Sequence, residues 1–256
     1  LFLLLSGIAF VSMFLPAVVV LQIQDFHDAR SFFYSGLIGL VLTSLVAIAL
    51  SGRNRRTTVL QQLLGLLASF AFLPLFLAVP FFEAVRSTTF LNAYVEMTSA
   101  LTTTGATLFE PARLSMAEHL WRAEVGWLGG LLMWISAAAI LAPLNLGGFE
   151  VTASAEPGQG GLRRVDMRAA SPGQRLIRTT KRLFPIYAGL TLTLWFCLII
   201  SGNTPLDGLM HAMATMSTSG ISAIGGLQES TAGIASEFLV FVFLLFALSR
   251  LTFSTD

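Results

Sequence analysis

Charged side chains are scarce in this chain of 256 residues. Asp, Glu, Lys and Arg together make up 11% of the sequence, whereas soluble domains carry about 25%. Hydrophobic residues make up 55%, and the mean hydropathy is +0.77. This shortage of charge excludes an ordinary soluble domain and predicts an all-α, polytopic membrane protein, because a helix satisfies its own backbone polar groups in lipid.

Cysteine and histidine are also rare. The single Cys197 lies in an apolar run and excludes both a disulfide framework and a cysteine-based metal site. The three histidines form no HExxH motif, and no GxSxG motif occurs. We therefore expect a protein that is not an enzyme, with no covalently bound cofactor and no nucleic-acid partner.

Long apolar runs dominate what is present. About 20 apolar residues at 1.5 Å each match a hydrocarbon core of roughly 30 Å, so each long run predicts a membrane span. The six runs are Leu1–Leu21, Ser31–Leu50, Leu60–Val79, Leu120–Ala142, Leu183–Ile200 and Ile234–Leu248. The first run begins with Leu rather than Met and has no cleavage site. We interpret it as a span and expect that the chain lacks its own start.

Basic residues fall mainly on one side of the membrane if these spans alternate in direction. Four lie on the other side: Arg30, Arg86, Arg113 and Arg122. The basic side carries Arg53, Arg55, Arg56, Arg163, Arg164, Arg168, Arg175, Arg178, Lys181, Arg182 and Arg250. The positive-inside rule makes this side cytoplasmic. The insert at 143–182 reads as a basic loop ending in a short amphipathic stretch, which meets either the inner headgroups or a soluble partner.

Two hydroxyl-rich stretches interrupt the apolar runs: SALTTTGATLFE from Ser99 and MATMSTSGISAIGG from Met213. They align at an offset of 115 residues, which sets Gly105 on Gly220 and Asn92 on Asp207. Asn and Asp are good N-caps, so each is expected to open a short helix of about ten residues. The unit of span, short helix, polar turn and span thus occurs twice, which is typical of pores and transporters.

Each short helix covers about half a membrane crossing, so it is predicted to be re-entrant, with its polar turn at membrane depth. Irregular backbone is tolerated there only inside protein or along a water-filled cavity. Backbone carbonyls in such a turn can replace the hydration shell of a cation. Gly105 and Gly220 would supply φ angles that side chains disfavour. A plain helix-packing contact is the alternative for one copy, but packing does not require cap, helix length and glycine twice.

Glu96 aligns with His211, and each is either a charged group near a pore mouth or a polar group bonded to backbone.

These motifs resemble the membrane subunits of the Trk/Ktr/HKT potassium transporter superfamily, most of all the bacterial TrkH type. LTTTGAT, Leu101 to Thr107, is similar to the first filter of that family. STTFLNAYVEMTSALTTTGAT and HLWRAEVGWLGGLLMWISAAAILAPL resemble its first pore helix, filter and following span. LDGLMHAMATMSTSGIS resembles the second filter, although Ser219 stands where the family often has a glycine.

The resemblance implies potassium uptake through two leading helices and four span–pore helix–span repeats with re-entrant loops. It divides the chain into a leading pair (1–58), a first repeat (59–142), a cytoplasmic basic linker (143–182) and a second repeat (183–256). The third and fourth repeats would follow. The implied filter residues are Thr103, Thr104, Gly105, Ala106, Thr218, Ser219, Gly220 and Ile221. K⁺ itself would lie at Thr103, Thr104, Thr218 and Ser219. The implied partners are a second copy of the chain and a cytoplasmic nucleotide-binding regulatory subunit of the TrkA type, at the bacterial inner membrane.

A secondary transporter with broken helices, moving another cation or a small solute, is the alternative function. Its usual mark is a charged group well inside a span. Ionisable residues in the predicted spans lie only near their ends, at Arg122, Glu124 and Arg250, which argues against this alternative.

Overall fold

The computed structural model describes residues 1–51, 59–141, 172–226 and 233–249, and over these residues every regular element is helical. Five helical stretches are long and apolar enough to cross a membrane. They are Phe2–Gln22, Phe26–Leu50, Leu60–Val85, Met116–Ile140 and Gly173–Ile200. These stretches correspond to the first five predicted runs, so the helical, multi-span fold class is confirmed.

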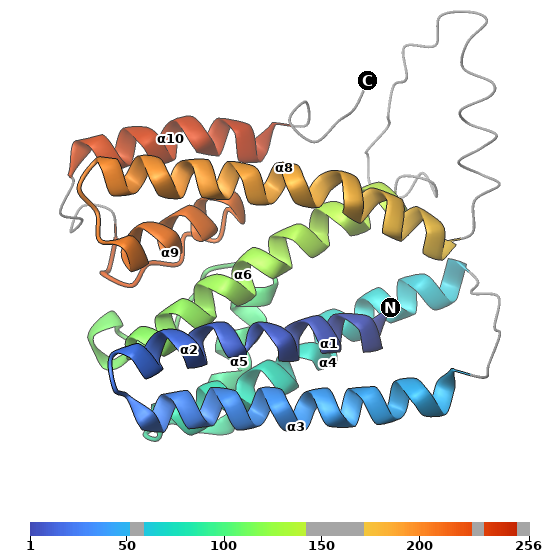
Figure 1. Cartoon of the computed structure of the whole chain (residues 1–256). Helices are drawn as coiled ribbons and strands as arrows, with labels where there is room; N and C mark the ends of the chain where they lie inside the picture. The colour runs from blue at the N-terminus through green and yellow to red at the C-terminus, as the bar shows by residue number, and fades with distance from the viewer. Residues whose placement is uncertain (52–58, 142–171, 227–232, 250–256) are drawn as a thin grey trace, which may run out of the picture.

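The leading pair of spans consists of a first span made of α1 (Phe2–Ser12) and α2 (Phe14–Gln22), which meet at Met13, and a second span, α3 (Phe26–Leu50). Figure 1 shows α1 and α2 lying along α3, and the three helices are in contact. From Phe33 onward, α3 exposes a long row of large apolar side chains, as expected for a surface that faces lipid. The first predicted run therefore forms one span with a break near its middle.

The next unit contains α4 (Val59–Val85), α5 (Phe90–Leu101), the short 3₁₀ helix η1 (Pro111–Arg113) and α6 (Met116–Ser136). A π-helical stretch, η2 (Ala137–Leu141), extends α6. The short α5 packs between α4 and α6. Its 12 residues cover about 18 Å at 1.5 Å each, too little to cross a bilayer.

The last unit contains α8 (Pro172–Ile200), α9 (Pro205–Met216) and α10 (Ile234–Leu248). Helix α8 begins well before the predicted run, so the basic stretch before Phe184 is the first part of this span and not a separate amphipathic segment. The expected boundary at residue 182 thus falls inside α8. Helix α10 has the bounds of the sixth predicted run, but its 15 residues are fewer than a full span needs.

Most residues of the predicted basic loops lie outside the described residues, including 53–56, 163–168 and Arg250. The structure therefore describes the helical frame and the two hydroxyl-rich turns, but not the loops on which the predicted orientation depends.

The predicted N-caps of the two short helices were wrong by three residues. Thr89 caps α5 by accepting a hydrogen bond from the backbone N–H of Asn92 at 3.3 Å. Thr204 caps α9 by accepting one from the N–H of Asp207 at 3.2 Å. Asn92 and Asp207 are thus third residues of their helices, where the N–H needs a partner and a threonine hydroxyl provides it.

Helix α6 lies at the centre of the molecule and joins the units. In Figure 1 it runs between the layer of α8, α9 and α10 and the helices α1 to α5. Trp121 donates a hydrogen bond from Nε1 to the carbonyl of Leu77 on α4 at 3.1 Å. Trp127 donates one from Nε1 to Thr191 Oγ1 on α8 at 2.9 Å. Helices α4 and α8 are thereby bonded to α6, against which α5 and α9 also pack.

Candidate functional site

The two hydroxyl-rich turns have the same backbone path after their helices. Thr103 and Thr218 follow the helix C-caps with positive φ, at 55° and 54°. Gly105 and Gly220 follow with φ of 71° and 67°. These values recur at the 115-residue offset that the sequence alignment predicted. A β-branched residue with positive φ is strained, at a cost of about 1–3 kcal/mol, so two such threonines mark a constrained turn.

Hydrogen bonds close the two helix ends in the same way. In the first turn, the N–H of Thr103 donates to the carbonyl of Ala100 and that of Thr104 donates to Ser99, both at 2.9 Å. The matching bonds of the second turn are Thr218 N to Thr215 O and Ser219 N to Ala214 O, both at 3.0 Å. These bonds resemble the left-handed C-terminal motifs that satisfy the last carbonyls of a helix.

Side-chain hydroxyls also pair across each turn. The Oγ1 atoms of Thr102 and Thr104 are 2.8 Å apart, and the Oγ atoms of Ser217 and Ser219 are 3.0 Å apart. The hydroxyls thus bond to one another within a turn. Thr103 and Thr218 lie between these paired hydroxyls in their turns, and both residues line the space between the turns.

The two turns approach each other directly. A Cβ atom built on Gly105 would overlap the carbonyl oxygen of Ser219, so no side chain fits there. A Cβ on Gly220 would have no neighbour within 4 Å, so only its φ favours glycine. The two turns that carry the eight predicted filter residues therefore meet at Gly105 and Ser219.

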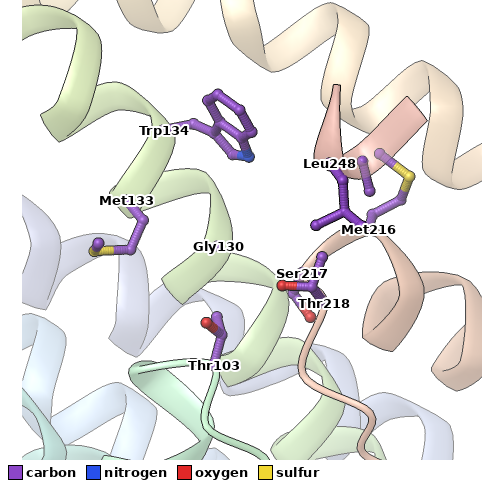
Figure 2. A pocket seen from close by; sticks show the side chains of 9 residues that line it. Thr103, Gly130, Met133, Trp134, Met216, Ser217, Thr218 and Leu248 are labelled. Atoms are coloured by element: carbon purple, nitrogen blue, oxygen red, sulfur yellow. The ribbon is translucent and has the colours of Figure 1, made fainter. Parts of the chain in front are cut away.

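A cavity of about 210 Å³ lies at the C-terminal ends of α5 and α9. Figure 2 shows Thr103 on one side of this cavity and Ser217 and Thr218 on another, with Gly130 of α6 between them. Met133, Trp134, Met216, Ala247 and Leu248 complete the lining. Helix C-termini carry partial negative charge, which favours a cation over an anion in this space.

Three glycines of α6 form the surface against which both turns pack. A Cβ on Gly129 would overlap the carbonyl oxygen of Leu101, the last residue of α5. A Cβ on Gly130 would lie 2.7 Å from Tyr187 Oη and 3.0 Å from Cα of Ser217. Gly126 would bring a Cβ within 3.4 Å of Ser219 Oγ. These glycines allow the ends of α5 and α9 to pack closely on α6.

The exposure of the filter residues differs between the turns. Thr103 and Gly105 are half-buried, and Thr104 and Ala106 are exposed. In the second turn Thr218 and Gly220 are exposed, whereas Ser219 and Ile221 are buried.

One carbonyl of the first turn already has an internal partner. Ser99 Oγ donates a hydrogen bond to the carbonyl of Ala106 at 2.6 Å, and sequence reasoning missed this serine. The bond turns the Ala106 carbonyl toward α5. Ala214 stands at the matching position of α9 and has no hydroxyl to offer.

Glu96 is buried and bonded to backbone, which agrees with the second of the two interpretations proposed for it. Its Oε2 accepts a hydrogen bond from the N–H of Leu108 at 2.9 Å. Its Oε1 lies 2.7 Å from Nε of Arg122 on α6. His211, its counterpart, is also buried.

The sequence suggested that Arg122 and Glu124 lie near the end of their span. The structure corrects this. Helix α6 begins at Met116, four residues earlier than predicted, and both side chains are buried within it. The argument that the spans lack internal charge therefore fails for α6.

No protein-family model matches the chain. In sequence it is 30% identical over 162 residues to the Trk system potassium uptake protein TrkH of Vibrio parahaemolyticus. It is 31% identical over 161 residues to TrkI of Halomonas elongata and 34% identical over 159 residues to TrkH of Escherichia coli K12. This chain is similar to Trk potassium uptake proteins. The resemblance inferred from the filter motifs is confirmed.

The Trk similarity extends to the fold. The crystal structure of the potassium transporter TrkH from Vibrio parahaemolyticus superposes with a TM-score of 0.74 and 24% sequence identity. That match covers 95% of this chain and 47% of the other.

The Trk relatives are longer than this chain. The matched regions make up 63%, 61% and 61% of this chain but only 32%, 29% and 30% of the three relatives. The chain thus spans about a third of the curated Trk proteins that it matches, and about half of the solved one. The names of these relatives describe potassium uptake. Together with the five apolar helices, these relatives indicate a multi-pass membrane protein.

Proposed function

We propose that this chain forms part of a Trk-type potassium uptake protein and contributes two turns to a K⁺-conducting filter. The observation that carries the proposal is the recurrence of the same positive φ angles and closing hydrogen bonds in the two turns. Positive φ recurs at Thr103 and Gly105 and again at Thr218 and Gly220. Strain that recurs at equivalent positions indicates a shape that function requires, and close rings of carbonyls are how filters bind dehydrated cations.

The ligands would be backbone carbonyl oxygens, with no resident cofactor. The proposed set is Thr103, Thr104 and Gly105 of the first turn and Thr218, Ser219 and Gly220 of the second. Ala106 and Ile221 are outer contributors. Ala106 is the weaker of these, because Ser99 occupies one lone pair of its carbonyl.

Two turns close only part of a ring, so the proposal requires further turns around the same axis. Repeats like the two in this chain supply them most simply, since the Trk relatives are longer. We assign residues 59–142 and 183–256 to the first and second repeats, 1–58 to the leading pair and 143–182 to a cytoplasmic basic linker, whose last residues form the start of α8.

The family resemblance supports the remaining parts of the proposal. The protein lies in the bacterial inner membrane with its basic loops on the cytoplasmic side. It forms a homodimer and binds a nucleotide-binding regulatory subunit of the TrkA type. The exposed Arg178 and Lys181 near the start of α8 offer a basic surface on the same side.

Cation-coupled secondary transport is the second candidate, and Glu124 favours it. This carboxylic acid is buried in α6, and its Oε2 has no hydrogen-bond partner among the residues that the structure describes. Ionisable groups in such positions often belong to ion or proton pathways.

Rubidium uptake into vesicles tests both candidates. The protein, as its native gene encodes it, is reconstituted, and ⁸⁶Rb⁺ uptake is measured with increasing external Na⁺. We expect a K⁺ gradient alone to drive ⁸⁶Rb⁺ uptake. We expect Na⁺ to inhibit this uptake more strongly in Gly105→Ser. Unchanged uptake and unchanged Na⁺ competition in that variant would reject the filter. Uptake that needs a second ion gradient, and loses this need in Glu124→Gln, would favour the second candidate.

A further inference from the structure

Glu96 connects three separate segments of the first repeat through one carboxylate. It lies on α5, its Oε2 accepts the N–H of Leu108 at 2.9 Å, and its Oε1 lies 2.7 Å from Arg122 Nε. Leu108 lies three residues after Gly105, on the segment that leaves the turn. Glu96 thus ties the pore helix and this segment to the central helix α6.

The connection is buried, which makes it directional and costly to break. Glu96 and Arg122 are each 2% exposed. A hydrogen bond to an ionised carboxylate is shorter and stronger than a neutral one. Removing one partner of a buried pair leaves the other charge uncompensated, so the two groups hold each other in place. The N–H of Leu108 is fixed by the same arrangement.

The second repeat lacks every part of this connection. At the 115-residue offset, Glu96, Leu108 and Arg122 correspond to His211, Ala223 and Glu237. Glu237 is exposed near the start of α10. His211 Nε2 is buried and has no hydrogen-bond partner among the described residues. The two turns therefore have similar φ angles, but the contacts that fix the segment after each turn differ.

We propose that Glu96 is a positioning residue for the first filter, which holds the segment after Gly105 through Leu108, while Arg122 compensates its charge. This inference rests on the proposed function, since it assigns cation selectivity chiefly to the first turn. A filter discriminates K⁺ from Na⁺ only while its carbonyls keep their spacing. The anchored turn keeps that spacing, and the second turn adapts to it.

Two double variants separate the hydrogen bond from the buried charge. Glu96→Gln with Arg122→Met removes both charges and keeps an amide oxygen that accepts the N–H of Leu108. Glu96→Leu with Arg122→Met removes both charges and the acceptor, at similar volume. His211→Leu is the matched control, because it removes a buried polar side chain from the equivalent position of the second repeat.

Two measurements are made on each variant of the protein as its native gene encodes it. The first is the concentration of Na⁺ that halves ⁸⁶Rb⁺ uptake. The second is hydrogen exchange of the backbone amides at 106–110. We expect Glu96→Leu/Arg122→Met to lower the half-inhibiting Na⁺ concentration about tenfold and to speed exchange about tenfold, as loss of one charge-assisted hydrogen bond implies. Glu96→Gln/Arg122→Met and His211→Leu should stay within about threefold of the native protein.

Equal Na⁺ inhibition and equal exchange in the two double variants would overturn the proposal, because Glu96 would then be only a structural ion pair. Faster exchange without a change in selectivity would also overturn it, since the anchor would not set the filter. A native protein that takes up no Rb⁺ would reject the proposed function itself, whereas the exchange rates would still show whether Glu96 holds Leu108.

Discussion

The two hydroxyl-rich turns are alike in backbone and unlike in surroundings. Their helix caps, helix lengths, positive φ angles and closing hydrogen bonds agree residue by residue at an offset of 115. Only the first turn has Ser99 bonded to the Ala106 carbonyl and Glu96 bonded to the Leu108 amide. The features common to both repeats therefore define the backbone conformation of the turn. The differences show which side chains fix each turn in place.

The largest effect is expected from alanine at the two turn glycines. Gly105→Ala meets both a positive φ and the backbone oxygen of Ser219, whereas Gly220→Ala meets the positive φ alone. A left-handed non-glycine residue costs about 1–2 kcal/mol, and overlap with backbone adds to this. We expect Gly105→Ala to abolish selective ⁸⁶Rb⁺ uptake and Gly220→Ala to weaken it.

The same uptake assay with Na⁺ competition measures this difference, and amounts of folded protein in the membrane provide the control. Equal losses in the two variants would show that the close approach of Gly105 to Ser219 has no role in transport. A greater loss of selective ⁸⁶Rb⁺ uptake in Gly220→Ala would show that Gly220, and not Gly105, is the more constrained position.

The sequence predicted those features of the two repeats that follow from composition and from the 115-residue offset. Apolar length located the spans, and the aligned glycines located both turns, because these properties are local. The helix starts were missed, since threonine, asparagine and aspartate are all good caps and only the structure shows which one accepts the bond.

The anchoring of the first turn could not be read from the sequence, because it depends on contacts between distant residues. Glu96 and Arg122 are 26 positions apart, and α6 was expected to begin near Leu120, which placed Arg122 at a span end. The mismatch of Glu96 with His211 in the repeat alignment was the one available signal. A buried charge that has no counterpart in its repeat points to a partner elsewhere.

A moderate effect is expected from alanine on the central helix. Gly129→Ala would press against the C-terminal end of α5, and Gly130→Ala against Tyr187 and Ser217 at the end of α9. Overpacking of this kind costs about 1–3 kcal/mol. Each variant should lower the thermal unfolding temperature and disturb mainly the turn that it faces.

Hydrogen exchange at 99–106 and at 214–221 distinguishes the two variants. We expect Gly129→Ala to speed exchange chiefly in the first segment and Gly130→Ala in the second. Gly189→Ala on α8 is the control, because a Cβ there has no neighbour within 4 Å. Similar exchange in both segments for both variants would mean that the two turns move as one body.

The smallest effect is expected at the helix caps, where the repeats agree. Thr89 and Thr204 each accept one hydrogen bond from the third backbone N–H of their helix, at 3.3 Å and 3.2 Å. Loss of such a cap costs about 1 kcal/mol, so Thr89→Ala and Thr204→Ala should lower the unfolding temperature by similar, small amounts. Serine at either position keeps the acceptor and should restore the loss. Thr204 also donates to Asp207 Oδ2 at 2.7 Å, so a larger loss in Thr204→Ala would show that this extra bond stabilises the second pore helix. The second repeat would then have a stabilising contact of its own at the N-terminal end of α9, whereas Glu96 acts from the middle of α5.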